Sequence, residues 1–511
     1  MGTKGENDMS KENPIYKRKT YCNPLSIPCI PKGGDSLAEN DWEGSMGYTE
    51  EPEVHYRSIS DPSIMYYDNK WYMYPSYGMC FVSEDFANWE HIPMTPYNLR
   101  YSPSVVPHRG KFLLTGHAHG LYISDSPTGP FDFVGNFKFS DGREYTLKDG
   151  NPIQPIDSAL FRDDDGRIYI YFFDTRPGDG KYEPFISQTY GVELDPDDPT
   201  RFMTDPVLIA EFNGDNVWER DGAYNQNPQF GWCEGQWMFK HNGRYYFIYS
   251  SSNTTCKNYC MAAYYSDESP LTGFVLQKNN PITIKTDGLA SGAGHGCIEH
   301  GPDNSLWAFY TITHCAVHAH ERRIGMAPIG IDENGELYCP AVTDTPQFAY
   351  GETENYLTDS DTGLFPLTFA HRHHMKSSSA APGRGTVYAF DESALTWWQP
   401  ADDDNEPTLY IDLEATYVCE ASRIMWREIG LDYDNGVLPD SFKYIIESRP
   451  TLNEGEWEVM LDMSKNEKDL IVDYQTFKPI VAREIRLRVL GWPKGTRPAV
   501  TSFTVFGTKD M

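Results

Sequence analysis

The sequence predicts an all-β protein of two domains, a five-bladed β-propeller followed by a β-sandwich. Two observations lead to this prediction. Five similar strand–turn–strand segments recur before residue 345, and residues 383–511 alternate apolar and polar side chains in short runs. No long segment has the 3.6-residue period of an amphipathic helix. The length of 511 residues fits two to four domains, and an all-β sandwich with unrelated hairpins is the alternative.

The propeller prediction rests on five hairpin-like segments. They begin at intervals of 41, 55, 77 and 61 residues, and apolar, β-branched and aromatic residues flank each turn. Asn-Gly and Asp-Gly pairs supply the positive φ angles that tight hairpins need. The expected turns are Asp68-Asn69, Arg109-Gly110, Asp165-Gly166, Asn242-Gly243 and Asp303-Asn304.

The first residue of each segment is the candidate functional position. These residues are Asp61, Ser102, Asp157, Glu234 and His295. Because the innermost strand of each propeller blade starts near the central axis, we expect the five side chains to share one pocket. An Asp before Pro or Ser is commonly a turn or cap residue, but three carboxylates in register are harder to explain in that way. Like charges so close raise one another's pKa, which favours a catalytic or cation-binding use.

These segments resemble motifs of glycoside hydrolase family 43, a family of five-bladed propeller enzymes, over residues 20–345. The resemblance is carried by Ser60-Asp61-Pro62-Ser63, Ile156-Asp157-Ser158-Ala159, Glu234-Gly235, Gly294-His295-Gly296, and Arg322-Arg323 before Ile324-Gly325-Met326-Ala327-Pro328. Either arginine could match the family's substrate-contacting Arg, and we assign that contact to Arg323. The chain departs from the family at Tyr101-Ser102-Pro103 and at Gly235-Gln236, where Gly-Pro is common.

The resemblance implies a role for each position. Asp61 is the expected general base, Glu234 the general acid, and Asp157 the residue that orients the acid and modulates its pKa. The expected substrate contacts are Ser102, His295 and Arg323. His295 is also the expected metal ligand, beside a calcium ion that is structural and not required for bond cleavage.

The implied activity is that of an inverting exo-glycosidase that releases terminal pentose or furanose residues from plant-type glycans. An α-L-arabinofuranosidase is the first expectation, with an oligosaccharide, arabinoside or xyloside as substrate. β-Xylosidase, galactofuranosidase and galactanase are alternatives within the family, and a non-catalytic, glycan-binding propeller is the alternative from another class. Inversion needs an acid and a base whose carboxyl groups are ~6.5–9.5 Å apart, leaving room for a water molecule.

Other histidines could suggest a zinc site, since His314, His318 and His320 have compatible spacing. We expect these residues, and also His117 and His119, at the rim of the substrate pocket instead.

Residues 346–382 are polar and small and predict a linker. Residues 383–511 resemble a discoidin-like (coagulation factor type C) domain, with Trp397 matching its buried structural tryptophan. The resemblance implies bracing of the catalytic domain or formation of a homo-oligomer at least as much as glycan binding.

The amino-acid composition of the chain limits the kinds of molecule that it is expected to bind. The chain has 43 Lys and Arg against 74 Asp and Glu, a net charge of −31. Such a surface repels phosphate backbones and anionic lipids, so we expect no nucleic acid and no membrane as partner. The first 20 residues lack the apolar region of a secretory signal, which predicts a cytoplasmic protein, and the ten cysteines are expected as reduced thiols.

Overall fold

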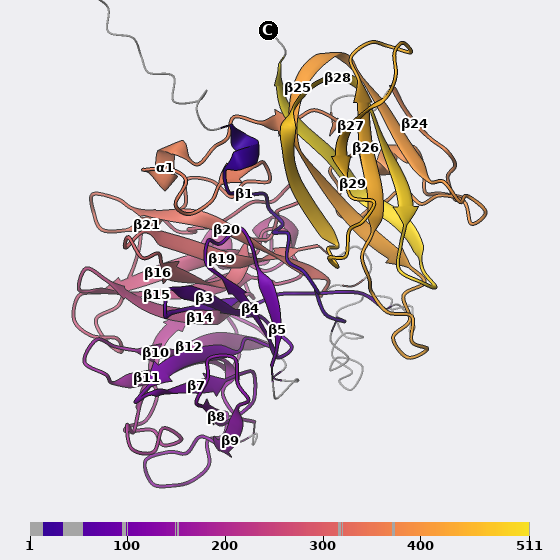
Figure 1. The fold of residues 1–511 in the computed structure, drawn as a ribbon. Coiled ribbons are helices and arrows are strands. Elements are labelled where there is room, and N and C mark those ends of the chain that lie inside the picture. Colours follow the sequence, from indigo (N-terminus) through magenta and orange to yellow (C-terminus); the bar gives the residue numbers. More distant parts are fainter. Residues whose placement is uncertain are drawn as a thin grey trace, which may run out of the picture. The chain divides into compact units, whose positions relative to one another are not determined.

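The computed structural model confirms a nearly all-β protein with a five-bladed propeller and a C-terminal sheet domain (Figure 1). It describes residues 14–33, 55–94, 99, 101–148, 150, 153–314, 318, 320–369 and 374–509. The one α-helix of the described residues is α1 (Tyr356–Asp359). None of the described helices has the length and apolar character needed to cross a bilayer.

Contacts divide the chain into two compact units. The propeller unit consists of Ile30–Glu84 and Trp89–Thr343. The C-terminal unit consists of Asp344–Met511 together with Met1–Cys29 and Asp85–Asn88.

The propeller has five four-stranded sheets, and in each the strands pair in chain order. Blade 1 contains β2 (Ser63–Tyr67), β3 (Lys70–Tyr74), β4 (Met79–Ser83) and β5 (Glu90–Pro93), and blade 2 contains β6 (Ser104–His108), β7 (Lys111–Thr115), β8 (Leu121–Ser124) and β9 (Asp132–Gly135). Blade 3 contains β10 (Ile156–Arg162), β11 (Ile168–Pro177), β12 (Phe185–Leu194) and β13 (Val207–Glu211). Blade 4 contains β14 (Trp232–His241), β15 (Arg244–Ser252), β16 (Cys260–Ser266) and β17 (Val275–Leu276), and blade 5 contains β18 (Gly294–His300), β19 (Leu306–Thr313), β20 (Arg322–Ile331) and β21 (Leu337–Tyr338).

The turns between the first two strands of the blades follow the sequence. Blades 1, 2 and 4 have two-residue turns in which both residues have positive φ, as a type I′ turn requires: Asp68-Asn69, Arg109-Gly110 and Asn242-Gly243. In blades 3 and 5 the connection between the first two strands is longer. The paired residues nearest the turn are Arg162 and Ile168 in blade 3, and His300 and Leu306 in blade 5. Here the residues with positive φ include Gly166 and Asn304.

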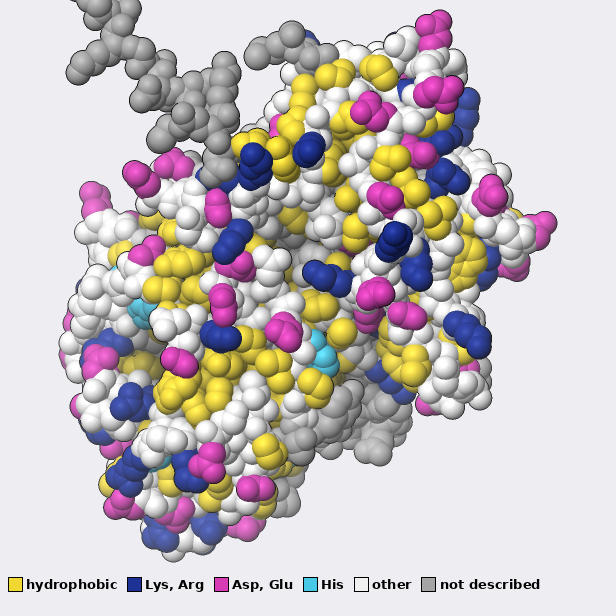
Figure 2. All heavy atoms as spheres, viewed as in Figure 1, with side chains coloured by type: hydrophobic (Ala, Val, Ile, Leu, Met, Phe, Trp, Pro, Cys, Tyr) yellow, Lys and Arg dark blue, Asp and Glu magenta, His cyan; other side chains and the backbone are white. Residues whose placement is uncertain are grey.

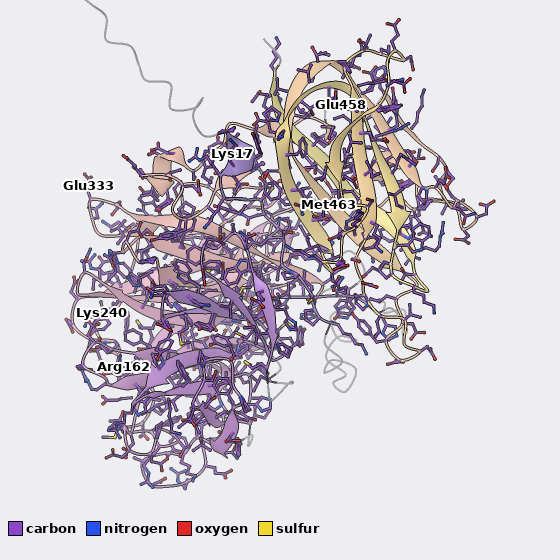
Figure 3. All side chains as sticks on the ribbon, in the orientation of Figure 1. Lys17, Arg162, Lys240, Glu333, Glu458 and Met463 are labelled. Atoms are coloured by element: carbon purple, nitrogen blue, oxygen red, sulfur yellow. The ribbon has the colours of Figure 1, made fainter. Side chains whose placement is uncertain are left out.

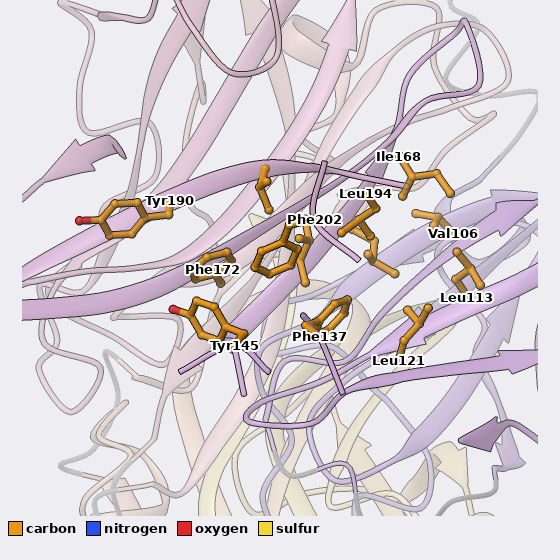
Figure 4. Close-up of a cluster of buried hydrophobic side chains, with 13 residues drawn as sticks. Val106, Leu113, Leu121, Phe137, Tyr145, Ile168, Phe172, Tyr190, Leu194 and Phe202 are labelled. Carbon is orange, nitrogen blue, oxygen red and sulfur yellow. The ribbon is translucent and has the colours of Figure 1, made fainter. Parts of the chain in front are cut away.

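Buried aromatic and aliphatic side chains hold neighbouring blades together. One cluster joins blades 2 and 3 and includes Leu113 and Phe172, with Phe202 from the loop that follows β12 (Figure 4). The rings of Phe172 and Phe202 are stacked, with centroids 6.2 Å apart. A second cluster joins blades 3 and 4 in the same way. Contact between blades therefore fixes the positions of the inner strands and of the residues at their starts.

The C-terminal unit is built on one seven-stranded sheet. Its strands are β23 (Phe365–Pro366), β24 (Met375–Ser377), β25 (Thr408–Ile429), β26 (Lys443–Arg449), β27 (Glu458–Asp462), β28 (Val472–Gly491) and β29 (Arg497–Lys509). The long strand β25 pairs with β24 and β28 in its first part, and with β28 and β29 after an interruption in register between Asp412 and Tyr417.

The segment 346–382, predicted as a linker, contributes strands to this unit. β23 pairs with β29, and β24 pairs with β25. β22 (Gln347–Phe348) pairs with β1 (Thr20–Tyr21) near the start of the chain. Backbone pairing does not require apolar side chains, which is why the polar composition did not reveal these short strands.

The surface carries charges of both signs. Figure 2 shows acidic and basic side chains interspersed on one face, with apolar areas between them. The described cysteines are all free thiols.

Candidate active site

The starts of the five inner strands share an unusual backbone conformation. Asp61, Ser102 and Asp157 have φ of 51°, 51° and 49°, and His295 has φ of 35°. A left-handed conformation costs a non-glycine residue roughly 1–2 kcal/mol, so its recurrence at equivalent positions marks a strained site. These four residues border one small cavity of about 20 Å³, whereas Glu234, the fifth residue expected there, is not among the residues that line it.

The fourth blade corrects the predicted register. Its left-handed residue is Gly235, with φ of 58°, so Gly235 and not Glu234 corresponds to Asp61 and Asp157. A Cβ at Gly235 would lie 2.8 Å from Cγ of His295, which explains why this position has no side chain. Glu234 therefore stands one residue earlier along its strand than the two aspartates do.

Asp61 is buried among hydrogen-bond donors. The hydroxyls of Ser60 and Ser76 donate to its Oδ2 at 2.9 and 2.6 Å. Arg322 Nη1 donates to its Oδ1 at 3.2 Å, and the Nδ1 atom of His295 lies 3.4 Å from the same oxygen. Burial alone raises the pKa of Asp61, but the charges of His295 and Arg322 and the Ser76 hydrogen bond lower it below its ordinary value. Asp61 is thus held as a carboxylate.

Asp157 is a second carboxylate with a lowered pKa. Ser102 Oγ donates to its Oδ1 at 3.2 Å, and His117 Nδ1 lies 3.0 Å from the same oxygen. Burial raises its pKa, whereas the hydrogen bond and charge of His117 and the charge of His295 lower it, to about 2. His117 thus contacts one of the carboxylates at the strand starts.

Glu234 has the opposite electrostatic environment. Tyr259 OH donates to its Oε1 at 2.9 Å, and no other described side chain donates to this carboxyl group. Burial and the charge of Asp157 raise the pKa of Glu234 to about 8, although the Tyr259 hydrogen bond and Arg322 act in the other direction. Glu234 therefore keeps its proton at neutral pH.

The assignment of the arginine is corrected. Arg323 donates to the carbonyl oxygens of Arg57 and Arg322 at 2.8 and 2.7 Å and to Glu321 at 3.2 Å, so it supports the backbone. Arg322 faces the pocket, where it contacts Asp61 and also donates to His320 Nδ1. Neighbouring residues of a strand point to opposite sides, and the sequence alone does not show which one faces the axis.

A pair of neighbouring carboxyl groups whose pKa values are pushed apart is the arrangement of an acid–base hydrolase, and the charge of Asp61 acts on Glu234. The family model for glycosyl hydrolases family 43 matches residues 52–337, more than half of the chain. The chain belongs to glycosyl hydrolase family 43. It is accordingly a glycoside hydrolase, whose substrates are carbohydrates.

The chain is also similar, at low identity, to several curated proteins. A β-xylosidase of Xylanibacter ruminicola is 26% identical, with 38% of this chain and 72% of the relative covered. The β-D-galactofuranosidase xynD of Aspergillus niger is 23% identical, with 47% and 69% covered. A xylosidase/arabinosidase of Bacteroides ovatus is 22% identical, with 43% and 77% covered. A solved thermostable family-43 glycoside hydrolase is 24% identical, with 60% of this chain and 100% of that chain covered and a TM-score of 0.47.

The cavity beneath the carboxylates has room for about one water-sized particle. Gln236 borders it, and its Oε1 atom is buried without a hydrogen-bond partner among the described residues. His295 Nε2 lies 3.0 Å from Ser102 Oγ, and its Nδ1 faces Asp61, so both ring nitrogens already face protein groups. The oxygen-rich lining fits either a water molecule or a hard cation such as calcium.

The sequence did not single out Tyr259 and Ser76, which donate hydrogen bonds to Glu234 and Asp61. Neither belongs to a repeated motif. Ser76 follows β3, and Tyr259 directly precedes β16. Only folding brings them to the axis.

Three of the histidines expected at the rim lie close to Tyr56, Arg322 or Glu321. His318 stacks on Tyr56 with ring centroids 4.5 Å apart, and His320 contacts Arg322. His314 is buried, with Nε2 3.8 Å from Glu321 Oε1.

A larger cavity of about 240 Å³ lies toward the opposite ends of the inner strands. It is bordered by Arg162, Lys240 and His300 among others, and Figure 3 labels the first two at the ends of β10 and β14. None of the three carboxyl groups of the pocket borders it, so we place the chemistry at the strand starts.

Proposed function

We propose that the protein is an inverting exo-glycosidase that releases terminal pentose or furanose residues, with an α-L-arabinofuranoside as its first candidate substrate. The observation that carries this proposal is the opposite shift of the pKa values of two carboxyl groups that interact electrostatically at the starts of the inner strands. The pKa of Asp61 is lowered by its charged neighbours, and that of Glu234 is raised to about 8 by burial and by Asp157. One group is thus ready to accept a proton and the other to donate one at neutral pH.

In the proposed reaction, Asp61 takes a proton from a water molecule as the water attacks the anomeric carbon. Glu234 donates its proton to the departing glycosidic oxygen, so the bond between the anomeric carbon and this oxygen breaks without an alkoxide forming. Asp157 takes no proton, and its negative charge keeps Glu234 protonated until the bond breaks. Arg322 keeps Asp61 ionised and in place.

The choice of sugar is supported by the names of the relatives. They are described as β-xylosidase, xylosidase/arabinosidase and β-D-galactofuranosidase, all of which act on pentose or furanose residues. β-Xyloside and galactofuranoside are therefore the next substrates to test. A non-catalytic glycan-binding role is disfavoured, because a binding site has no need of a buried carboxyl group that stays protonated at neutral pH.

The experiment is a substrate panel with purified protein. We expect turnover of one among nitrophenyl α-L-arabinofuranoside, β-D-xyloside and β-D-galactofuranoside, and proton NMR should show that the first product has the inverted anomeric configuration. Retention would contradict the roles of Asp61 and Glu234. The absence of turnover on all three, and on arabinose-substituted xylo-oligosaccharides, would favour the binding alternative.

Leaving-group dependence tests the two roles separately. A dinitrophenolate departs without protonation, so Glu234→Ala should lose ~10²–10⁴-fold on natural linkages and much less on a dinitrophenyl glycoside. Asp61→Ala should be slow on both, because the water must be activated whatever leaves. Equal loss of both activities in Glu234→Ala would contradict its role as the acid.

Two further proposals concern the cavity and the C-terminal unit. We propose that the axial cavity holds one water molecule or a structural calcium ion, beside Gln236 and His295. Calorimetry with calcium, and thermal melting with and without a chelator, test for the ion.

We propose that the C-terminal unit is a discoidin-like sandwich that braces the catalytic unit. Trp397 supports bracing over glycan binding, since Arg384 and Arg427 cover its ring at 3.3 and 4.1 Å.

A further inference from the structure

In every blade, one residue at the end of the second strand, or just beyond it, lies opposite the start of the inner strand. In blades 1 and 2 the backbone N–H of this residue donates to the carbonyl oxygen opposite it: Ser76 to Ser60, and His117 to Tyr101. In the other three blades the residues are paired in the sheet: Phe173 with Ile156, Ser250 with Glu234, and Thr311 with Gly294. Each residue on the inner strand directly precedes the left-handed residue of its blade.

Two sets of five residues are thus equivalent from blade to blade. The left-handed residues, which we call the axial residues, are Asp61, Ser102, Asp157, Gly235 and His295. The residues on the second strands, which we call the support residues, are Ser76, His117, Phe173, Ser250 and Thr311. The support residues are of four different types, so the sequence shows no motif that would reveal them.

Four support residues contact the axial residue of the next blade. The contacts join Ser76 Oγ to Ser102 N at 3.3 Å, His117 Nδ1 to Asp157 Oδ1 at 3.0 Å, Ser250 Oγ to His295 N at 2.7 Å, and Thr311 Oγ1 to Asp61 N at 2.8 Å. The fifth support residue is Phe173, and the axial residue of the next blade is Gly235. A polar support residue therefore occurs wherever the next axial residue has a side chain.

Thr311 makes the contact that joins the last blade to the first. Blade 5 meets blade 1 only through non-covalent contacts, and Thr311 and Asp61 are 250 residues apart in the sequence. The Thr311 side chain is fully buried. Its Oγ1 lies 3.1 Å from the carbonyl oxygen of His295 and 3.3 Å from Asp61 Oδ1, so its single proton goes to one of these acceptors. Thr311 thus contacts both the backbone and the carboxyl group of Asp61.

The backbone of Asp61 depends on such a contact. Its φ of 51° is unfavourable for a residue with a side chain. Its N–H lies outside the regular pairing of β2 with β3, which starts at Ser63, and the Thr311 hydroxyl is the acceptor that satisfies it. A general base must lie within about 2.6–3.2 Å of the atom whose proton it takes, so a small shift of this backbone would slow the reaction.

We propose that Thr311 is a positioning residue for Asp61: its hydroxyl fixes the backbone of Asp61 so that the carboxylate reaches the attacking water. This inference rests on the proposed function, which makes Asp61 the general base. Thr311 acts only through Asp61, and it takes no part in proton transfer to the leaving group.

The test removes the Thr311 hydroxyl and keeps the shape of the side chain. With the nitrophenyl glycoside that the substrate panel identifies, Thr311→Val should lower kcat about 10- to 100-fold and change KM less than about twofold. Thr311→Ser keeps the hydroxyl, so its kcat should stay within about threefold of wild type. The loss in Thr311→Val should be equally large on the dinitrophenyl glycoside, because the water must be activated whatever leaves.

A double variant separates positioning of Asp61 from a general loosening of the site. In the Asp61→Ala background no carboxylate remains to be positioned, so the addition of Thr311→Val should change the residual rate less than about twofold. A similar loss in both backgrounds would overturn the inference. If Thr311→Val does not fold, Thr311→Ala, which also lacks the hydroxyl and is smaller, replaces it in both backgrounds.

Thr189→Val is the matched control for the loss of a buried hydroxyl. Thr189 is also a fully buried strand threonine, on β12, and its hydroxyl donates to the carbonyl oxygen of Ala210 at 3.4 Å. Thr189→Val should lower the melting temperature and leave kcat unchanged.

The outcomes separate this inference from the proposed function. If the wild-type protein turns over no substrate, or if Asp61→Ala keeps full activity, the proposed function fails and the inference fails with it. If Asp61→Ala is slow but Thr311→Val keeps its kcat, or if Thr311→Ser loses as much as Thr311→Val, the inference alone is wrong. A loss in Thr311→Val that is larger on the nitrophenyl than on the dinitrophenyl glycoside would also overturn it, because the acid would then be the group disturbed.

Discussion

Replacement of Glu234 by glutamine should stabilise the protein, and the gain should grow with pH. The pKa of Glu234 is about 8 in the folded protein against an ordinary value of 4.5, because burial and Asp157 disfavour its charged form. Below pH 4.5 the group is protonated in both the folded and the unfolded chain and contributes nothing. As the pH rises from 4.5 to 8, the unfolded chain releases this proton and the folded chain keeps it, so the free energy of unfolding falls.

The size of the effect follows from the difference in pKa. One pKa unit corresponds to about 1.4 kcal/mol, so at pH 7 the 2.5 units above 4.5 amount to roughly 3 kcal/mol, as an upper bound. Above pH 8 the full difference gives roughly 5 kcal/mol. Glutamine stays neutral at every pH, and its amide oxygen can still accept the hydrogen bond from Tyr259. With about 2 °C per kcal/mol for a large domain, the propeller of Glu234→Gln should melt about 6 °C higher at pH 7.

The assay is thermal melting of wild type and Glu234→Gln between pH 5 and pH 9, following the transition of the propeller unit. The melting temperatures should be nearly equal at pH 5 and diverge up to about pH 8, above which their difference should stay constant. Asp132→Asn, at an exposed position on β9, is the matched control and should show no such divergence. A difference between Glu234→Gln and wild type that is constant with pH, or that favours wild type as the pH rises, would refute the reasoning.

Five other substitutions test the site and the strand segments that support it. Asp157→Asn removes a like charge from beside Glu234, the proposed general acid, so the alkaline limb of the kcat/KM profile should move about one unit lower. Tyr259→Phe removes a hydrogen bond to the ionised form of Glu234, so the same limb should move higher. Arg322→Lys should reduce kcat/KM by about 10²-fold, whereas Arg323→Lys should lower the melting temperature and leave kcat/KM unchanged. Gly235→Ala should lower both the activity and the melting temperature, measured by kinetics and calorimetry, because its Cβ would lie 2.8 Å from an imidazole ring and φ is positive.

The repeated features of the fold could be predicted from the sequence. Turn pairs such as Asp68-Asn69 and Asn242-Gly243 require positive φ at both residues, and few residue pairs meet that requirement. The turn pair in each repeat therefore predicts a hairpin, and the recurrence of the hairpins predicts the propeller. The strands of residues 346–382 gave no such signal, because they are two or three residues long.

The site was predictable only where it follows the repeat. Asp61 and Asp157 lie where the register placed them, but Glu234 is displaced by one residue, because the repeat position in blade 4 needs a glycine beside His295. Arg322 and Arg323 are adjacent in the sequence, and only the side of the strand distinguishes their roles. Tyr259 lies outside the repeat and reaches Glu234 through the fold alone.

The displacement of Glu234 explains how one pocket holds carboxyl groups of opposite character. Asp61 and Asp157 occupy the strained repeat position, where hydroxyl, imidazole and guanidinium donors converge and favour the ionised form. Glu234, one residue earlier, receives a hydrogen bond from Tyr259 but is otherwise governed by burial and by the charge of Asp157. The same donors that ionise Asp157 thereby help to keep Glu234 protonated. A glutamate at the repeat position would meet the donors of the aspartates and lose its proton, so the separation into acid and base depends on this one-residue shift of the backbone.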